Sequence, residues 1–344
     1  MHEPAGFDVG KVSTWLAEHV DGLVLPLMWT KLAGGHSNVT YRVDDQSGRR
    51  FVLRRPPLGE LQPTAHDMGR EFRVIAALWP TSVPVPEPIA YCDDPEVIGA
   101  RFYAMGWVEG RSIYTVLDVE EHLSVPARAR AGMSFIDTLA ELHALDPDDV
   151  GLGSFGKRDS YVGRQLHRWY ASWNASKERD VPDVDRLHEF LVTRLPEQTT
   201  VSLVHGDYGL HNCRVAAEGH IAAVIDWEIS TLGDPLADLA YCMNAWSEAG
   251  EKTAGDTPAP TALPGFCSRQ ELLDRYSERT NADLRQIEYY RCFNYWKVVC
   301  ILQGVYDRYA HGQKDADGVE IGHFTLRMAE NLQLAVEAAE RLAG

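Results

Sequence analysis

Two short polar segments, each attached to an apolar run, constrain this chain more than any other part of its sequence. The first, 205–212, reads HGDYGLHN and places Asn212 five residues after Asp207. The second places Asp226 at the end of the apolar run 221–225. Phosphoryl transfer needs such a set of groups: one carboxylate accepts a hydroxyl proton, while an amide oxygen and a second carboxylate hold magnesium on nucleotide phosphates. An Asp and an Asn at this spacing are common by chance, so the hypothesis depends on their occurrence in this order with Asp226.

Length and charge restrict the partners of the chain. It has 344 residues and a formal net charge of −17. A chain of this length suits two lobes or domains with a sizeable core. The negative charge argues against nucleic acid and anionic membranes as partners and favours a neutral or cationic small molecule. A nucleotide remains compatible with this charge, because magnesium and a few local Arg or Lys side chains can offset its phosphates. The sequence does not indicate an oligomeric state.

Cysteine usage and the N-terminal residues predict a cytoplasmic protein. The six cysteines contain no Cys-x-x-Cys pair and are too sparse for a disulfide framework, so we expect reduced, mostly buried thiols. Residues 1–4 are polar and lack the core of a signal peptide. No apolar run approaches the ~20 residues of a membrane span.

The first third of the sequence is expected to be rich in strands. Amphipathic helices are predicted over 8–20 and 66–79 from their apolar spacing. The loop 34–38, which reads GGHSN, separates two strand-like runs and indicates a hairpin. The predicted strands cover 27–33, 38–44, 50–54, 88–92 and 101–107.

Helices dominate the remainder. Short strands at 201–205 and 221–225 flank the polar segment that carries Asp207. Asp234 suits a helix N-cap, and the proline after it suits the first helical position. Helices are predicted over 127–144, 161–175, 235–247 and in the range 268–344, with a surface loop at 253–266. The pattern predicts an α+β, bilobal fold with a small antiparallel-sheet lobe at 1–105 and a larger, mainly helical lobe at 106–344. A nucleotide is expected in the cleft between them.

Six motifs in a fixed order give the chain a family resemblance. They are GGHSN at 34–38, FVLRRPP at 51–57, REF at 70–72, HGD through Asn at 205–212, IDWE at 225–228, and Gly-Asp-Pro with Asp-Leu-Ala at 233–240. With these motifs the chain resembles the aminoglycoside phosphotransferase and choline kinase family, which has a protein-kinase-like fold. It is particularly similar to the branch that is sometimes fused to acyl-CoA dehydrogenases. The Asp-to-Asn spacing is that of the protein-kinase catalytic loop.

The resemblance implies a role for individual residues. Asp207 would be the catalytic base, and Asn212 and Asp226 would bind Mg²⁺. Asp238 would hold the catalytic loop from the helix beneath it. Backbone N–H groups of the loop 34–38 would cover the phosphates of ATP. The nucleotide-binding positions that it implies are Gly34, Gly35, Ser37, Asn38, Arg54, Glu71 and, at the adenine hinge, Met105 and Trp107.

Three positions depart from the kinase pattern. The loop GGHSN is not Gly-x-Gly-x-x-Gly, so it could also be a plain hairpin turn. Asp226 is followed by Trp-Glu rather than Phe-Gly, which is usual for small-molecule kinases. Arg54 stands where the family has a lysine that contacts phosphate, and Glu71 would pair with it. Arginine is planar and bidentate whereas lysine is a point charge, so geometry and rate can differ. Arg55 would point to the other face of the strand.

Structural explanations compete with the functional ones. Asp207 and Asp226 could be capping residues, and Asn212 could occupy a left-handed turn. Arg54 and Glu71 could be ordinary exposed charges. His205, His143 and Asp234 are interpreted as structural.

The sequence favours an ATP- and Mg²⁺-dependent phosphotransferase acting on a hydroxyl of a small molecule. The acceptor could be aminoglycoside-like, an amino alcohol or a hydroxyacyl compound. A catalytically weak or inactive kinase-like nucleotide-binding module is the alternative, supported by Arg54 alone. A metal hydrolase using His205, Asp207, His211 and Asp226 is a third hypothesis, which the missing Asp-x-His motif disfavours.

Overall fold

The computed structural model describes residues 7–32, 38–57, 67–251, 259–312 and 320–343. The chain divides into two compact units. The first unit comprises residues 1–110 together with 221–230, and the second comprises 111–220 together with 231–344. The predicted domain boundary between residues 105 and 106 stays a prediction.

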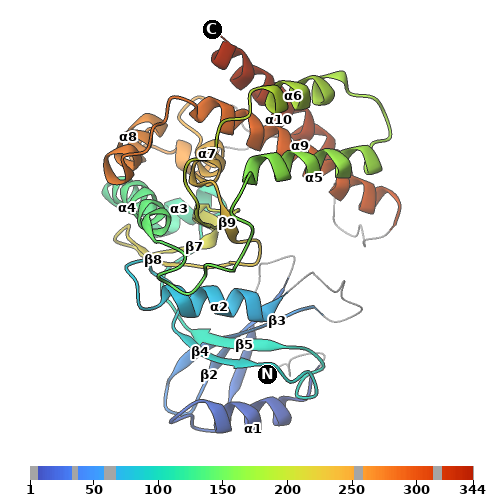
Figure 1. The fold of residues 1–344 in the computed structure, drawn as a ribbon. Coiled ribbons are helices and arrows are strands. Elements are labelled where there is room, and N and C mark those ends of the chain that lie inside the picture. The colour runs from blue at the N-terminus through green and yellow to red at the C-terminus, as the bar shows by residue number, and fades with distance from the viewer. Residues whose placement is uncertain (1–6, 33–37, 58–66, 252–258, 313–319, 344) are drawn as a thin grey trace. The chain divides into compact units, whose positions relative to one another are not determined.

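A five-stranded antiparallel sheet forms the centre of the first unit (Figure 1). Its strand order is β1-β2-β3-β5-β4. The predicted hairpin is present, since Met28 pairs with Asp44 and Lys31 with Tyr41. The strands run over Met28–Lys31 (β1), Val39–Asp44 (β2), Arg50–Arg55 (β3), Pro88–Cys92 (β4) and Phe102–Gly106 (β5). All five strands predicted from this part of the sequence are therefore confirmed.

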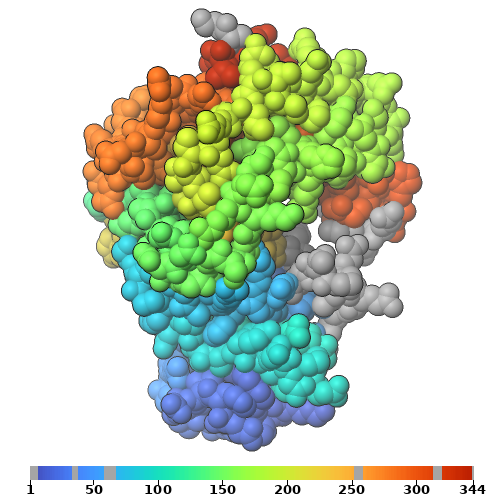
Figure 2. All heavy atoms as spheres, in the orientation of Figure 1, coloured from blue at the N-terminus to red at the C-terminus, as the bar shows by residue number. Residues whose placement is uncertain are grey.

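Two helices cover opposite faces of this sheet. Helix α1 (Val9–His19) buries Val12 and Leu16 in one hydrophobic cluster with Phe51 and Phe102, and its outer side forms part of the surface (Figure 2). Helix α2 (Met68–Leu78) lies on the other face, where Phe72 stacks on Tyr91 at 5.7 Å between ring centroids. Successive strand residues alternate between faces. This alternation places Arg54 of β3 on the α2 side.

A segment from the later sequence completes the first unit. Strand β8 (Ile221–Val224) ends with the Val224 N–H donating to the carbonyl oxygen of Pro84 at 2.8 Å. Trp227 is fully buried, and its indole N–H donates to the Val224 carbonyl. Arg70 of α2 donates to the Ser230 carbonyl at 3.0 Å. These bonds attach the turn that contains Asp226 to the first unit.

The second unit is built mainly of helices around α9. Helix α9 packs against α10, α7, α5 and α6. Strand β6 (Ser202–Val204) pairs antiparallel with β9 (Thr231–Gly233). The longer helices are α4 (Val125–Ala144), α5 (Tyr161–Ser176), α6 (Pro182–Thr193), α7 (Pro235–Ala245), α8 (Arg269–Thr280), α9 (Ile287–Ala310) and α10 (Ile321–Ala343).

Most helices of the second unit agree with the predicted ranges, but α3 (Val116–His122) and α6 were not predicted. Helix α3 has only seven residues and begins with a capping box between Thr115 and Asp118. Helix α6 starts with a proline at its first position and buries only Val184, Leu187 and Leu191. Helix α3 is too short to show an apolar period, whereas Val184, Leu187 and Leu191 of α6 have a helical spacing from which this helix could have been predicted.

Two sequence expectations concern the whole chain. All six cysteines are free and buried, as predicted. Among the residues that the structure describes, no helix is both long and apolar enough to cross a membrane.

The turn after β7 (Cys213–Val215) gives a stability prediction. Gly219 has φ = +97°, and a Cβ there would lie 2.2 Å from the Ala127 carbonyl oxygen. Gly151 also has a positive φ of +72°, but a Cβ there would meet no described atom within 4 Å. Gly151→Ala should therefore lower the free energy of unfolding by only the ~1–2 kcal/mol that a left-handed conformation costs alanine. Gly219→Ala should lower it by about 2 kcal/mol more, because a backbone atom must also move. Chemical denaturation of both variants measures the difference; equal losses would contradict it.

Candidate active site

The catalytic-loop segment of the second unit brings Asp207 and Asn212 together. The loop leaves β6 and ends in the short 3-10 helix η1 (Leu210–Asn212). Asp207 Oδ1 accepts a hydrogen bond from the Tyr241 hydroxyl at 2.6 Å, and Oδ2 accepts one from Asn212 Nδ2 at 3.0 Å. His211 Nε2 lies 3.4 Å from the same Oδ2. The aspartate is thus held by groups on both of its oxygens.

These neighbours keep the Asp207 carboxylate ionised. Burial alone would raise its pKa, but the hydrogen bond and charge of His211 and the hydrogen bond from Tyr241 lower the pKa of Asp207 to about 2. An ionised, oriented carboxylate can accept a proton from a hydroxyl placed against it. Neutral pH therefore leaves this group ready to act as a base.

The Asn212 side chain is held through its amide nitrogen. Its amide nitrogen donates to the Asp207 carbonyl at 2.9 Å as well as to Oδ2. The amide oxygen accepts no hydrogen bond from the residues that the structure describes, although the side chain is only 5% exposed. Amide oxygens are ligands that Mg²⁺ accepts.

Asp238 of α7 fixes the backbone of the catalytic loop. Its Oδ2 accepts from the His205 N–H at 2.7 Å and its Oδ1 from the Gly206 N–H at 2.8 Å. His143 Nε2 lies 3.3 Å from Oδ2, and His143 Nδ1 lies 2.7 Å from the Tyr276 hydroxyl. Burial would raise the pKa of Asp238, but the hydrogen bond and charge of His143 and the charge of His205 lower it. The geometry agrees with the positioning role that the resemblance implied for Asp238.

In the first unit, Arg54 lies at the centre of a cluster of acidic residues. Its Nη2 donates to Asp226 Oδ1 at 2.6 Å and lies 3.8 Å from Glu228 Oε2. Its Nε lies 3.3 Å from Glu71 Oε2, so the predicted pairing with Glu71 is present. Arg54 is 7% exposed. Burial would lower its pKa, but Glu71, Tyr103, Asp226 and Glu228 together raise it. Arg55 instead lies on the other face, 5.5 Å from the ring of Phe7.

Glu71 carries an incompletely compensated charge. The carboxylate is fully enclosed, and neither oxygen accepts a well-aligned hydrogen bond among the described residues. Burial raises the pKa of Glu71 to about 7, and the charge of Arg54 opposes that shift. Among the described residues, the Arg54 guanidinium thus faces the carboxylates of Glu71, Asp226 and Glu228.

The backbone at Asp226 is held in an unusual conformation. Asp226 has φ = +67°, a left-handed conformation that few non-glycine residues adopt and in which Asp is enriched. Two residues later, Glu228 Oε2 accepts a hydrogen bond from Asn38 Nδ2 at 3.0 Å. Asn38 is thereby fixed at the start of β2, on the same unit as Asp226.

The remaining predicted nucleotide-binding residues lie partly outside the described structure. Gly34, Gly35 and Ser37 belong to segment 33–37, which is not among the described residues. Met105 lies in β5 opposite Val52, and Trp107 follows the end of that strand. The roles proposed for these five residues stay predictions.

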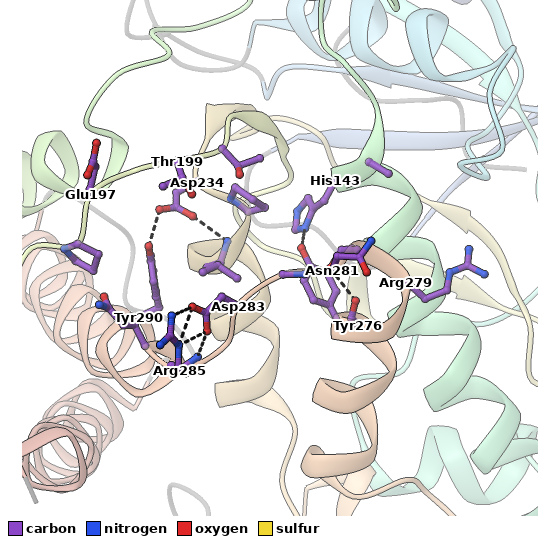
Figure 3. A pocket seen from close by; sticks show the side chains of 18 residues that line it. His143, Glu197, Thr199, Asp234, Tyr276, Arg279, Asn281, Asp283, Arg285 and Tyr290 are labelled. Atoms are coloured by element: carbon purple, nitrogen blue, oxygen red, sulfur yellow. Dashed lines mark hydrogen bonds and ion pairs between the residues drawn. The ribbon is translucent and has the colours of Figure 1, made fainter.

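Two cavities of the second unit differ in their relation to the catalytic loop. A cavity of about 920 Å³ is lined by residues such as Asp234, Tyr290 and Arg279 and by none of the predicted site residues (Figure 3). Its Asp234 carboxylate accepts from the Tyr290 hydroxyl at 2.8 Å, which supports the structural interpretation of Asp234. A smaller cavity of about 180 Å³ borders the loop itself and includes Leu210 and His211.

Sequence reasoning missed three residues that contact the predicted site. Tyr241 bonds Asp207, Glu228 bonds Asn38, and Tyr103 lies buried beside Glu71 and Arg54. Glu228 and Tyr241 could have been identified from the sequence, because Glu228 is the last residue of the motif IDWE and Tyr241 directly follows the motif DLA. Tyr103 was not, since it resembles any other aromatic residue of a buried strand.

The chain is similar in sequence to a described protein family and to several known proteins. A sequence model described as the phosphotransferase enzyme family matches residues 29–278. Acyl-CoA dehydrogenase family member 11 from Gallus gallus is 32% identical, over 98% of this chain and 44% of that protein. The chain spans less than half the length of the curated relatives it matches.

Solved structures show the same fold. A candidate aminoglycoside phosphotransferase from Ralstonia eutropha is 29% identical with a TM-score of 0.83, covering 97% of this chain and 99% of that one. A thermostable mutant of aminoglycoside phosphotransferase APH(4)-Ia, solved with ADP and hygromycin B, is 17% identical with a TM-score of 0.61, covering 97% and 99%. The predicted α+β, protein-kinase-like fold and the family resemblance are confirmed.

Removal of the Asp238 carboxylate should destabilise the second unit strongly. Asp238→Ala leaves the N–H groups of His205 and Gly206 buried without an acceptor, so we expect a loss of about 3–5 kcal/mol in the free energy of unfolding. The control variant Asp274→Ala, which removes an exposed carboxylate of α8, should change the free energy of unfolding by less than about 0.5 kcal/mol.

The pH dependence separates this effect from simple side-chain loss. Because folding lowers the pKa of Asp238, its stabilisation is complete above the ordinary carboxyl range and is lost as the pH falls through the folded-state pKa. The free energies of unfolding of wild type and Asp238→Ala should therefore differ at neutral pH and converge as the pH becomes acidic. A constant difference would show that the charge is not what stabilises the loop.

Proposed function

Because the chain belongs to the phosphotransferase enzyme family, we propose that it transfers the γ-phosphate of ATP to a hydroxyl group of a small molecule with the help of Mg²⁺. The observation that carries the proposal is the ionised Asp207, hydrogen-bonded to an Asn212 whose amide oxygen is left unbonded within the described structure. We propose further that these residues and Asp226 meet around the nucleotide. The likeness to a phosphotransferase that was solved with ADP supports the choice of an adenine nucleotide.

The transfer would need little covalent chemistry from the protein. The acceptor oxygen attacks the γ-phosphorus and forms a new P–O bond, while the bond from that phosphorus to the β–γ bridging oxygen breaks and ADP leaves. The hydroxyl proton passes to Asp207, which is ionised at neutral pH. Tyr241 and Asn212 hold the two carboxylate oxygens and thereby orient the base. Alignment of the reactants supplies most of the rate enhancement.

The donor set fits a magnesium ion. Asn212 offers an amide oxygen and Asp226 a carboxylate, both hard oxygen ligands of the kind that Mg²⁺ prefers. Glu228 also places a carboxylate near Asp226 and Arg54. When bound, Mg²⁺ would neutralise charge on the phosphates, and Arg54 would add to that neutralisation.

A second candidate function is supported by the bond between Arg54 and Asp226. This bond, at 2.6 Å, uses an oxygen of a proposed metal ligand, as would suit a nucleotide-binding module that has lost activity. The intact Asp207 and Asn212 favour the enzyme. Nucleotide binding that is independent of Mg²⁺, without ADP release for any acceptor, would favour the inactive module.

The acceptor belongs to one of three classes: aminoglycoside-like compounds, amino alcohols and hydroxyacyl compounds. The phosphotransferase relatives support the first class, and the matches to acyl-CoA dehydrogenase family members support the third. An ADP-release screen with ATP and Mg²⁺ against all three classes distinguishes them. The kinase-like fold itself does not choose among acceptors.

Replacement of the proposed base tests the mechanism. Asp207→Asn keeps the size of the side chain and removes its ability to take a proton. We expect kcat to fall by about 10²–10⁴ while the Kd for ATP·Mg changes little. Turnover by ADP release and nucleotide binding by calorimetry measure the two quantities. Full activity in this variant would end the assignment of Asp207 as the base.

Arg54 is tested against another arginine of the same strand. Arg54→Met should raise the KM for ATP about tenfold or more, because a buried charge beside the phosphates is lost. Arg54→Lys should retain most activity, since lysine is the usual residue of the family at this position. Arg50→Met removes an exposed charge of β3 that pairs with Glu109 and should have little effect. Equal KM values for Arg54→Met and Arg50→Met would show that Arg54 does not contact the nucleotide.

A further inference from the structure

A lysine is buried in the helical interior of the second unit. Lys297 lies in the middle of α9, is only 8% exposed, and is surrounded in sequence by Tyr295, Trp296 and Val298. Taking an ammonium group out of water is unfavourable unless other groups compensate the charge. A charged residue at this place therefore calls for an explanation beyond packing.

No carboxylate directly neutralises this lysine. Its Nζ lies 4.9 Å from the ring centroid of Tyr241 and 5.8 Å from that of Phe293, which are distances of cation–π contacts. Within the described part of the chain, Lys297 forms no ion pair and donates no hydrogen bond. Two aromatic faces hold the ammonium in place, and its hydrogen-bonding capacity is left unused there.

Tyr241 connects this lysine with the proposed base. The hydroxyl of the same tyrosine ring donates to Asp207 Oδ1 at 2.6 Å. Arg327 of α10 acts on this ring as well, since its charge opposes the rise in the pKa of Tyr241 that burial and Asp207 cause. The surroundings of Asp207 therefore contain positive charge, although the chain as a whole carries −17.

We propose that Lys297 is a specificity residue that binds an anionic group of the acceptor, a carboxylate or a phosphate, while Asp207 takes the proton of the acceptor hydroxyl. This inference rests on the proposed function and narrows its substrate class. An acceptor oxygen at Asp207 would lie about one tyrosine side chain away from the ammonium, so an anionic group a few bonds further along the acceptor could reach it. A cationic group at the same place on an acceptor would instead be repelled by the Lys297 ammonium.

Matched acceptors test the charge preference. Hydroxybutyrate, its amide and the corresponding amino alcohol differ only at the end remote from the hydroxyl, and glycerol phosphate with glycerol forms a phosphate pair. The wild-type enzyme should release ADP with a lower KM for the anionic member of each set. A preference for the amide or the amino alcohol would overturn the proposal and leave the phosphotransferase activity standing. The two anionic probes show whether a carboxylate or a phosphate is preferred.

A pair of lysine variants locates the preference. Lys297→Met should raise the KM for the anionic acceptors about tenfold or more and leave that for the neutral ones nearly unchanged. Lys177→Met removes the same charge from the end of α5, where Lys177 pairs with Asp180, and should change neither. Lys297→Arg should retain part of the preference for anions. A uniform loss for charged and neutral acceptors in Lys297→Met would show a structural role only.

Two further measurements keep the test decisive if turnover is weak or Lys297→Met fails to fold. Calorimetry of hydroxybutyrate binding to the wild-type protein with ADP and Mg²⁺ should detect binding, and its absence would overturn the proposal independently of the chemistry. The binding should also weaken as the pH rises through about 8, because burial lowers the pKa of Lys297 to about 8 against the opposing charges of Asp238 and Asp207. The other groups near it are Tyr241, whose pKa is raised well above its ordinary value, and the charged Arg327. Binding that is constant from pH 7 to pH 10 would exclude Lys297 as the anion ligand.

Discussion

The buried carboxylate of Asp238 is the interaction on which the catalytic loop depends. It accepts two backbone N–H groups of the loop, from His205 and Gly206, and it is itself held by His143. Because the His205 and His143 donors are buried with it and Gly206 is only partly exposed, the loop has little access to alternative partners in water at this point. Asp207 follows these two residues directly, so its backbone position is set by a bond to helix α7 rather than by the loop alone. The chain thus holds its proposed base with a helix, which is a more rigid support than a loop.

A different balance of charge organises the first unit. Arg54 lies among Glu71, Asp226 and Glu228, and its guanidinium cannot satisfy three carboxylates at once. Burial is the main cause of the raised pKa of Glu71; Arg54 opposes this rise, and the charges of Asp226 and Glu228 add to it. An arginine at this position reaches two acidic residues through different nitrogens, which a lysine ammonium could do only at closer range. The substitution of arginine for the usual lysine therefore fits the acidic cluster in which it is found.

Particular residues show how far the sequence could predict this arrangement. The pairing of Arg54 with Glu71 was predictable, because strand alternation separates Arg54 from Arg55 and places only one of them on the face that α2 covers. The contact of Tyr241 with Asp207 was predictable as well, because Tyr241 lies three residues after Asp238 and therefore on the same face of α7. Helix α6 also carries a sequence signal, since Val184, Leu187 and Leu191, which face the interior of the second unit, are spaced as on one side of a helix. The place of Tyr103 beside Glu71 was not predictable, because nothing in the sequence distinguishes Tyr103 from other aromatic residues of buried strands.

The case of Lys297 shows why whole-chain charge is a poor guide to the acceptor. A net charge of −17 suggests a cationic substrate, but surface charges are screened over about 10 Å at moderate ionic strength. The ammonium of Lys297 is shielded from water by Tyr241 and Phe293, so its field at Asp207 is screened far less than that of the many exposed carboxylates. A few buried charges near the reacting hydroxyl therefore outweigh a large number of distant ones. The surroundings of Asp207 hold a buried ammonium as well as carboxylates, so a bound acceptor would meet charges of both signs there, and the net charge of the chain does not describe them.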